Sequence, residues 1–413
     1  MLYELREMQR AWLQPFSVWA DGMSKLYANP YSPFAHAPFA RRISAGWELL
    51  HRLGKDYEKP SFGLATTTID DHEVTVVERI EVSKPFCNLI KFERLMPRAL
   101  ADRPRDPAVL LFAPLSGHYA TLLRDTVRAL LPDHEVWITD WIDARTVPRS
   151  KGTFSLDDYI AYAIEFMRTL GPDLHVIAVC QPTVPVLAAV SVMSTLEDPG
   201  VPASLTLMGG PVDPRRSPTE VNNLATTRPL SWFEQNVIHQ VPSIHPGAGR
   251  RVYPGFLQHL GFVAMNPDRH MKSHWDFYLD LVRGDLEDAD AHRRFYDEYN
   301  AVLDMDAAYY LDTVRLVFQE HALPRGTWRV SFEGREVRVA PEDIRTPRLL
   351  TVEGELDDIS GTGQTQAAID LCAGIPADRK HHHTAAGAGH YGIFSGRRWR
   401  ESIYPLVRDF IRA

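Results

Sequence analysis

The chain has 413 residues, of which 45% are hydrophobic and 10% aromatic, and its formal net charge is −8 at pH 7. This composition is sufficient for a large hydrophobic core, or for one large domain that carries an insertion. No basic run and no nucleic-acid-binding motif stands out, so the sequence argues against a nucleic-acid partner. The three cysteines, Cys87, Cys180 and Cys372, lie far apart and form no disulfide framework, which favours a reducing compartment.

The N-terminal residues are charged and lack the apolar region of a signal peptide. No stretch of about 18 or more apolar residues occurs, so the sequence predicts no membrane span. We therefore expect a cytoplasmic protein.

Residues 1–60 are predicted to form an N-terminal helical segment that packs on the core of the protein. Residues 3–28 have the spacing of an amphipathic helix. Its apolar positions recur every three or four residues: Leu5, Met8, Trp12, Phe16, Trp19 and Met23. Such a stripe usually packs on its own domain, and the alternative is contact with a hydrophobic particle or another subunit.

Residues 61–212 and 336–413 are predicted to form one α/β core. Apolar strand-like segments alternate there with helical patterns, which is typical of a doubly wound, mostly parallel sheet. The predicted strands are 74–80, 86–92, 108–113, 135–139, 174–179, 204–208, 347–353 and 380–384. Between them, residues 213–335 are rich in proline, histidine and aromatic residues, and they predict an inserted, mainly helical lid.

Cys180 lies where an apolar strand ends and a helix of small apolar residues begins. The arrangement resembles the nucleophile elbow of the α/β-hydrolases, with a thiol in place of a hydroxyl. The usual Gly-x-Ser-x-Gly pattern reads Ala178-Val-Cys180-Gln-Pro182 here, so alanine and proline replace both glycines. The competing interpretation is a buried structural cysteine.

An acid and a histidine should follow the nucleophile in that order. Asp357 follows a predicted strand in a Gly354-Glu-Leu-Asp motif, and His390 lies in a glycine-rich loop after the next strand. Glu355 and Asp358 are alternatives for the acid, and the spacing favours Asp357. The backbone N–H groups of Leu115 or Ser116, together with that of Gln181, are candidates for an oxyanion hole.

Four further side chains are candidates for binding substrate: His118, Tyr119, Trp232 and Tyr391. Residues 381–383 are three consecutive histidines, but neighbours on a strand point to opposite faces, so we expect no metal site there. The arginine pairs at 215–216, 250–251 and 397–398 could meet phosphates, although such pairs are more often solvated surface.

The chain resembles the intracellular poly(3-hydroxybutyrate) depolymerases over nearly its whole length. The matching stretches are Ala178-Val-Cys180-Gln-Pro-Thr-Val-Pro185, Ala45-Gly-Trp-Glu-Leu-Leu50, Asp140-Trp-Ile-Asp143 and Val317-Phe-Gln-Glu-His-Ala-Leu-Pro324. That family is similar to the polyhydroxyalkanoate synthases, which share the cysteine nucleophile and the α/β-hydrolase fold. The resemblance implies a Cys180-His390-Asp357 triad that cleaves polyester through an acyl-thioester.

The same resemblance implies the polymer or its granule surface as the partner, and a granule-associated location. No cofactor is expected, although coenzyme A could replace water as the acyl acceptor. Two alternatives stay open: a synthase-like acyltransferase that uses the same cysteine, and a non-catalytic granule-binding protein. Assembly into a homo-oligomer is also left open.

Overall fold

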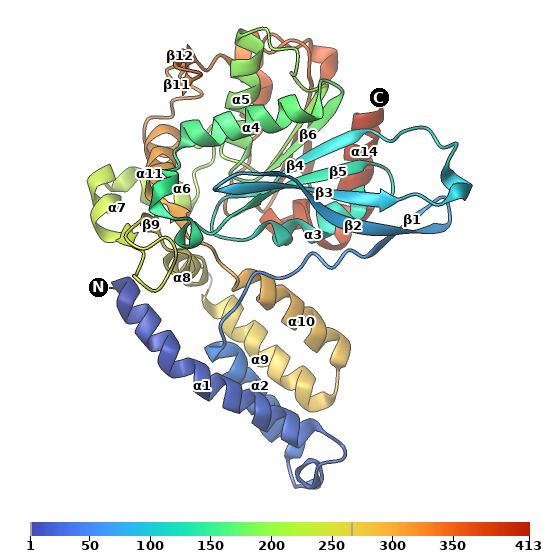
Figure 1. The fold of residues 1–413 in the computed structure, drawn as a ribbon, viewed down its shortest axis with the longest axis vertical. Helices are drawn as coiled ribbons and strands as arrows, with labels where there is room; N and C mark the ends of the chain where they lie inside the picture. The colour runs from blue at the N-terminus through green and yellow to red at the C-terminus, as the bar shows by residue number, and fades with distance from the viewer. Residues whose placement is uncertain (1, 266) are drawn as a thin grey trace.

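The computed structural model describes residues 2–265 and 267–413. A nine-stranded sheet forms its centre, in the order β1-β2-β3-β5-β4-β6-β7-β13-β14 (Figure 1). Its strands are β1 (Thr66–Ile69), β2 (His72–Ser83), β3 (Cys87–Leu95), β4 (Ala108–Phe112), β5 (Glu135–Trp141), β6 (Leu174–Val179), β7 (Ser204–Met208), β13 (Arg348–Gly354) and β14 (Lys380–Ala385).

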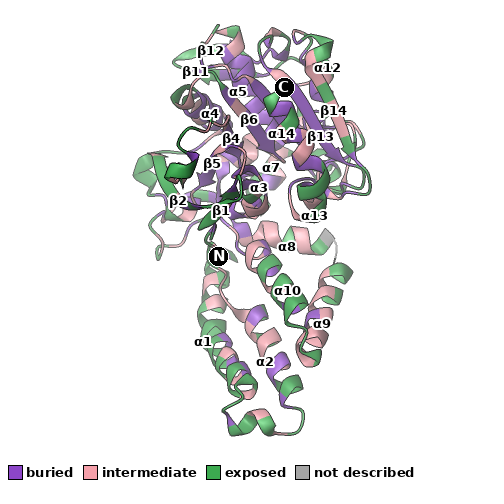
Figure 2. Ribbon diagram, turned by 90° about the vertical axis from the view of Figure 1, so that its right-hand side faces the viewer, coloured by how far each residue is buried: buried purple, intermediate pink, exposed green. Residues whose placement is uncertain are grey.

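The first three strands run as an antiparallel meander, and β3 also pairs antiparallel with β5. From β5 to β14 every pair is parallel. Helices α4 (Leu156–Leu170) and α5 (Thr183–Thr195) pack on each other on one side of the sheet, and α3 (Arg124–Leu130) and α14 (Tyr404–Arg412) pack together on the other (Figures 1 and 2). This is the α/β-hydrolase fold, as the sequence predicts.

The core lies between these layers. Strands β4, β6 and β7 are buried almost throughout, and α5 is buried from Thr183 to Met193. A helix that is apolar on all sides must lie inside the protein, because no face suits water. Both neighbours of Cys180 in the chain are therefore rigid, buried elements.

The segment between β7 and β13 is mainly helical, as predicted, but it also contains short strands that the sequence analysis missed. Its helices are α6 (Glu220–Thr227), α7 (Leu230–Asn236), α8 (Gly255–Met265), α9 (Pro267–Arg283), α10 (Leu286–Tyr299) and α11 (Ala307–Asp312), followed by a π-helix at Thr313–Gln319. Strands β8 (His239–Gln240), β9 (Arg251–Tyr253) and β10 (Met305–Asp306) form one small sheet, and β11 (Arg329–Phe332) and β12 (Arg335–Arg338) form a hairpin.

The N-terminal helices α1 (Leu2–Ala28) and α2 (Ala40–Gly54) lie mostly away from the α/β core, which differs from our expectation. They form a projecting helical arm with α9 and α10 (Figures 1 and 2). Ion pairs join α2 to α10, between Arg52 and Asp297 and between Glu48 and Arg293. At the N-terminal end of α1, Tyr3 packs into a small apolar cluster with Ala144, Val241 and Val252.

The arm therefore combines two segments that are far apart in the sequence. The apolar pattern of α1 predicts a packed helix, but it does not say which element the helix packs against. None of the described helices is long and apolar enough to cross a membrane.

Candidate functional site

Cys180 stands on a strained turn between β6 and α5. Its φ angle is 65°, a left-handed conformation that is uncommon for residues other than glycine. Its backbone N–H donates to the carbonyl oxygen of Met208, at 2.7 Å, which holds the turn against the end of β7. A positive φ at the residue between a buried strand and a buried helix is the geometry expected for a nucleophile elbow.

Space for this turn comes from a neighbouring strand. A Cβ atom added to Gly210 would collide with the carbonyl oxygen of Cys180 and with the side chain of Thr183. The elbow can therefore do without the glycines that Ala178 and Pro182 replace, because Gly210 at the end of β7 provides the room.

His390 and Asp357 lie side by side at the edge of the sheet where the parallel strands end. The Nδ1 atom of His390 is 2.7 Å from an oxygen of Asp357, and both side chains are buried. The other oxygen of Asp357 accepts the backbone N–H groups of Ile359, at 2.9 Å, and Ser360, at 2.8 Å. A carboxylate fixed in this way holds the orientation and tautomer of the imidazole.

The alternative acids contact other groups. The carboxylate of Glu355, an exposed residue, accepts the backbone N–H of Gly387, and Asp358 is also exposed. Among the three acids, Asp357 is the one that hydrogen-bonds to His390 in this structure.

The charges around His390 change its pKa strongly. Burial by itself would lower the pKa of the imidazole, but the charges of Cys180 and Asp357, and hydrogen bonds to both, raise it well above its usual range. The shift has the direction expected for an imidazolium beside two anionic groups. The thiol, the imidazole and the carboxyl group therefore interact as one set.

The predicted oxyanion donors line the same cavity. Leu115 and Ser116, from the loop after β4, line it together with Cys180 and Gln181. Within the described residues, the backbone N–H groups of Leu115, Ser116 and Gln181 have no hydrogen-bond partner. Free N–H groups beside a nucleophile are available to bind a developing oxyanion.

The cavity above Cys180 has a volume of about 480 Å³. Most of the residues that line it come from the segment between β7 and β13, and most of these are apolar, whereas a smaller polar part of the wall includes Cys180 and His390. Its aromatic walls are Phe233, Tyr253, Phe262, Tyr309, Tyr310, Phe318, Tyr391 and Phe394. A pocket with apolar walls and a few polar groups at one end suits an apolar ligand with one reactive polar bond.

Two of the four predicted substrate residues lie at this cavity. His118 and Tyr391 line it, and burial lowers the pKa of His118 to about 4, so this imidazole is neutral at pH 7. Tyr119 and Trp232 are elsewhere. The hydroxyl of Tyr119 faces Asp143, at 3.4 Å, and the indole of Trp232 packs edge-on against Phe233.

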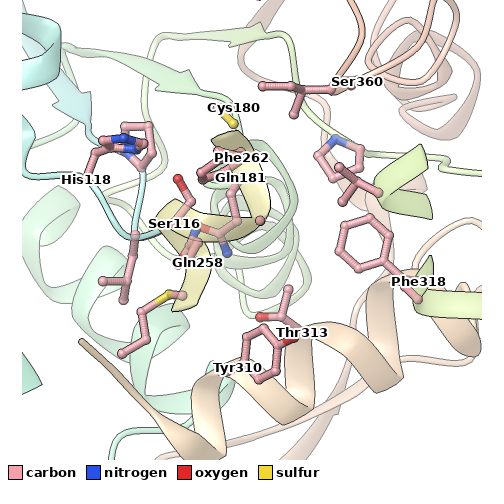
Figure 3. Close-up of a pocket in the computed structure, with 18 of the residues that line it drawn as sticks. Ser116, His118, Cys180, Gln181, Gln258, Phe262, Tyr310, Thr313, Phe318 and Ser360 are labelled. Atoms are coloured by element: carbon pink, nitrogen blue, oxygen red, sulfur yellow. The ribbon is translucent and has the colours of Figure 1, made fainter. Parts of the chain in front are cut away.

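Helix α8 contributes cavity residues that the sequence analysis did not single out as substrate-binding. Figure 3 shows Gln258 and Phe262 of this helix close to Cys180, Gln181 and His118. A Cβ atom on Gly117 would lie 2.5 Å from the side-chain oxygen of Gln258, so this glycine allows α8 to approach the oxyanion loop. The aromatic richness of residues 213–335 does not indicate which of these side chains line the cavity.

The histidine run and the arginine pairs have other contacts. His382 hydrogen-bonds with Thr351 and Thr384, and within the described residues no group of three or more His, Cys, Asp or Glu side chains could hold a metal ion. Each paired arginine contacts an acidic side chain or a backbone carbonyl, and none lines the cavity: Arg215, Arg216, Arg250, Arg251, Arg397 and Arg398.

Residues 209–413 match the family profile described as PHB de-polymerase C-terminus. The chain belongs to the PHB depolymerase family. The matched residues include Asp357, His390 and the aromatic wall of the cavity, and the family match supports ester hydrolase activity.

Solved structures that resemble this PHB depolymerase family member are distant. One is 2-hydroxy-6-oxo-6-phenylhexa-2,4-dienoate hydrolase from a Rhodococcus species, with 13% identity, a TM-score of 0.45, and coverage of 82% of this chain and 100% of that one. Another is a monoacylglycerol lipase from Paleococcus ferrophilus, with 15% identity, a TM-score of 0.42, and coverage of 74% and 95%. A comparison with curated protein sequences finds no match.

Proposed function

We propose that this protein cleaves poly(3-hydroxybutyrate) with Cys180 as the nucleophile, His390 as the acid and base, and Asp357 as the residue that orients His390. The observation that carries the proposal is the position of Cys180 on a strained elbow that opens into the same cavity as His390, with Asp357 hydrogen-bonded behind it. The family match to PHB depolymerases supports the choice of a polyester as the substrate.

The proposed reaction has two stages. The thiolate of Cys180 attacks an ester carbonyl, and the N–H groups of Gln181 and of Leu115 or Ser116 stabilise the oxyanion. The acyl–oxygen bond then breaks, His390 gives its proton to the departing alkoxide, and an acyl-thioester remains on Cys180. In the second stage His390 takes a proton from the acceptor, which attacks the thioester and releases the thiolate.

The acceptor determines the product. Water yields 3-hydroxybutyrate monomer or oligomers, whereas the thiol of coenzyme A yields 3-hydroxybutyryl-coenzyme A. Transfer from one thioester to another is nearly isoenergetic, so a cysteine nucleophile is compatible with both acceptors. Under this proposal the enzyme needs no cofactor and works on polymer at the granule surface.

The test is the intact mass of the protein after incubation with amorphous poly(3-hydroxybutyrate) granules, with and without coenzyme A. We expect a 3-hydroxybutyryl adduct on the wild type and none on Cys180→Ala. Faster loss of the adduct with coenzyme A would indicate thiolysis, and an unchanged rate would indicate hydrolysis. Unchanged ester cleavage by Cys180→Ala would refute the proposal.

Cys372→Ala is a suitable control. Cys372 is buried, and burial raises the pKa of its thiol to about 12, so it should form no adduct. Cys372→Ala should therefore keep the adduct of the wild type. Chain lengthening from 3-hydroxybutyryl-coenzyme A would instead indicate the synthase-like alternative, and polymer binding without any ester cleavage would indicate a granule-binding protein.

A further inference from the structure

The apolar stripe of α1 faces outward. The sequence pattern predicts a buried stripe, but the side chain of Trp12 is 82% exposed, and Leu5, Met8, Phe16, Trp19 and Leu26 are also exposed. Met23, on the same face, is half-buried. Together these seven residues form what we call the α1 stripe.

A different face of α1 packs on the arm. Ser17, Ala20 and Ser24 are its buried residues in contact with α2, and the hydroxyl of Ser24 lies 3.3 Å from that of Ser44. The charged residues Glu7 and Arg10 also turn away from the stripe, because they pair with His245 and Asp56. In Figure 1, α1 is the outermost helix of the arm, with α2 between it and α9.

The α1 stripe is symmetric about its own centre. Reading outward from the bond between Pro15 and Phe16, Trp12 mirrors Trp19, Met8 mirrors Met23, and Leu5 mirrors Leu26. Each mirrored pair has the same residue type. In two helices that run antiparallel about a two-fold axis, residues at mirrored positions lie opposite each other, so this stripe is complementary to a second copy of itself.

We propose that α1 is a homodimer interface in which two α1 helices pack antiparallel, with the two-fold axis close to Phe16. Trp12 of each protomer faces Trp19 of its partner, and the methionine and leucine pairs extend the contact toward both ends. Leu5, Trp12, Trp19 and Leu26 are each seven residues apart, which is the spacing that keeps a seam facing another helix.

The α1 stripe alone is small for a stable interface. A helix of 27 residues is about 40 Å long and about 10 Å wide, so the α1 stripe spans at most about 400 Å² in projection, whereas a stable interface buries about 800 Å² per partner. Trp47 of α2 extends it, because its ring packs on those of Phe16 and Trp19. Ile43 and Leu50, which lie within about one helical turn of Trp47 in α2, are also exposed.

The mirror symmetry favours a second copy over a polymer surface as the occupant. A flat apolar particle would bind any exposed apolar stripe, whatever the order of its residues. A two-fold interface instead requires that the same patch be complementary to itself. The inference concerns assembly and does not depend on the proposed chemistry.

The first test is the mass of the full-length protein in solution, measured by sedimentation across a wide concentration range. We expect a species of twice the chain mass of 46.8 kDa for the wild type, and a single-chain mass for Trp12→Glu. Val18→Glu is the matched control. Val18 is 64% exposed on the same helix but lies off the stripe, so this variant should remain dimeric.

The second test reads the register by cross-linking with a short bis-maleimide. Chains with Met8→Cys and chains with Met23→Cys should cross-link when they are mixed, but neither should cross-link alone. Residues 8 and 23 are about 22 Å apart along a helix, so identical positions in an antiparallel pair are too distant for the reagent. Wild-type chains provide the blank, because Cys87 and Cys372 are buried and Cys180 lies in the cavity.

Three results would overturn the proposal. One is a wild type that stays at single-chain mass at every concentration, and another is a Met8→Cys chain that cross-links to itself. The third is a monomeric wild type that binds amorphous polyester particles, when Trp12→Glu abolishes this binding and Val18→Glu leaves it unchanged. That last result would identify the α1 stripe as a polymer anchor.

Discussion

Gly210 and Cys180 approach each other so closely that no side chain fits between them. A Cβ atom on Gly210 would overlap the carbonyl oxygen of Cys180 and the side chain of Thr183. We therefore expect Gly210→Ala to displace the elbow, to lower stability by about 1–3 kcal/mol, and to remove most of the ester cleavage. Thermal unfolding and hydrolysis of a soluble ester measure the two effects.

Gly46→Ala is the control for this substitution. Gly46 lies within α2 and has no atom within 4 Å of an added Cβ, so alanine should leave activity unchanged and stabilise the helix by about 0.5–1 kcal/mol. Equal activity of the two variants would show that the elbow does not depend on Gly210.

The identity of the acid can be tested with two neighbouring carboxylates. Asp357→Asn removes the charge that faces His390, and we expect the rate of ester cleavage to fall on the order of 10²- to 10⁴-fold. Glu355→Gln should change it little, because the Glu355 carboxylate contacts the N–H of Gly387 and not the imidazole. The reverse order of effects in a kcat/KM comparison would reassign the acid.

Arg250 and Arg251 are adjacent, but they have different structural roles. Arg250 is buried, pairs with Asp306 at 2.8 Å and donates to the carbonyl oxygens of Val147, Pro148 and Gly152. Arg250→Met leaves the charge of Asp306 buried and unpaired, so we expect a loss of about 3–5 kcal/mol in the free energy of unfolding.

Arg251→Met provides the comparison, because Arg251 pairs with Glu234 at the surface. Surface ion pairs contribute about 0–1 kcal/mol to stability, so the free energy of unfolding measured with denaturant should barely change. Similar losses for both variants would contradict the assignment of Arg250 as a buried link between the lid and the core.

Asp304 should make stability depend on pH. Burial, with the nearby charge of Asp143, raises the pKa of Asp304 from 3.8 to about 7. The folded chain therefore holds a proton that the unfolded chain has released, and the free energy of unfolding should fall as the pH rises from 3.8 to about 7. The slope due to one such proton is about 1.4 kcal/mol per pH unit.

Asp304→Asn should flatten this part of the stability profile, because the amide does not titrate. Asp102→Asn, at an exposed position, serves as the control and should keep the profile of the wild type. Denaturant titrations at several pH values between 4 and 8 measure the slopes, and parallel profiles for the wild type and Asp304→Asn would exclude this role.

Much of the α/β core was predictable because its signals are local. Each buried strand is a short apolar run, and each helix after it has its own period, so β4 to β7 and β13 fall where the sequence predicts them. Cys180, Asp357 and His390 were predictable for a related reason, since each follows the end of a parallel strand and these ends share one edge of the sheet.

Other features depend on contacts between distant segments, and the sequence does not contain them in a local form. The stripe of α1 has the pattern of a buried helix face, but Ser17 and Ala20 on another face form the contact with α2. Tyr119 and Trp232 have suitable side chains near suitable loops, yet neither lines the cavity. Gln258 enters the site because α8 crosses it, and no motif marks that crossing.

The helical arm can be assembled only late in the synthesis of the chain. Helices α1 and α2 leave the ribosome early, but α9, which packs on α2, begins at Pro267, about 210 residues later. At about 5–20 residues per second, the N-terminal helices wait roughly 10–40 s for that partner. During this interval the face of α2 that packs on α9 has no partner, so this contact can form only after most of the α/β core has been synthesised.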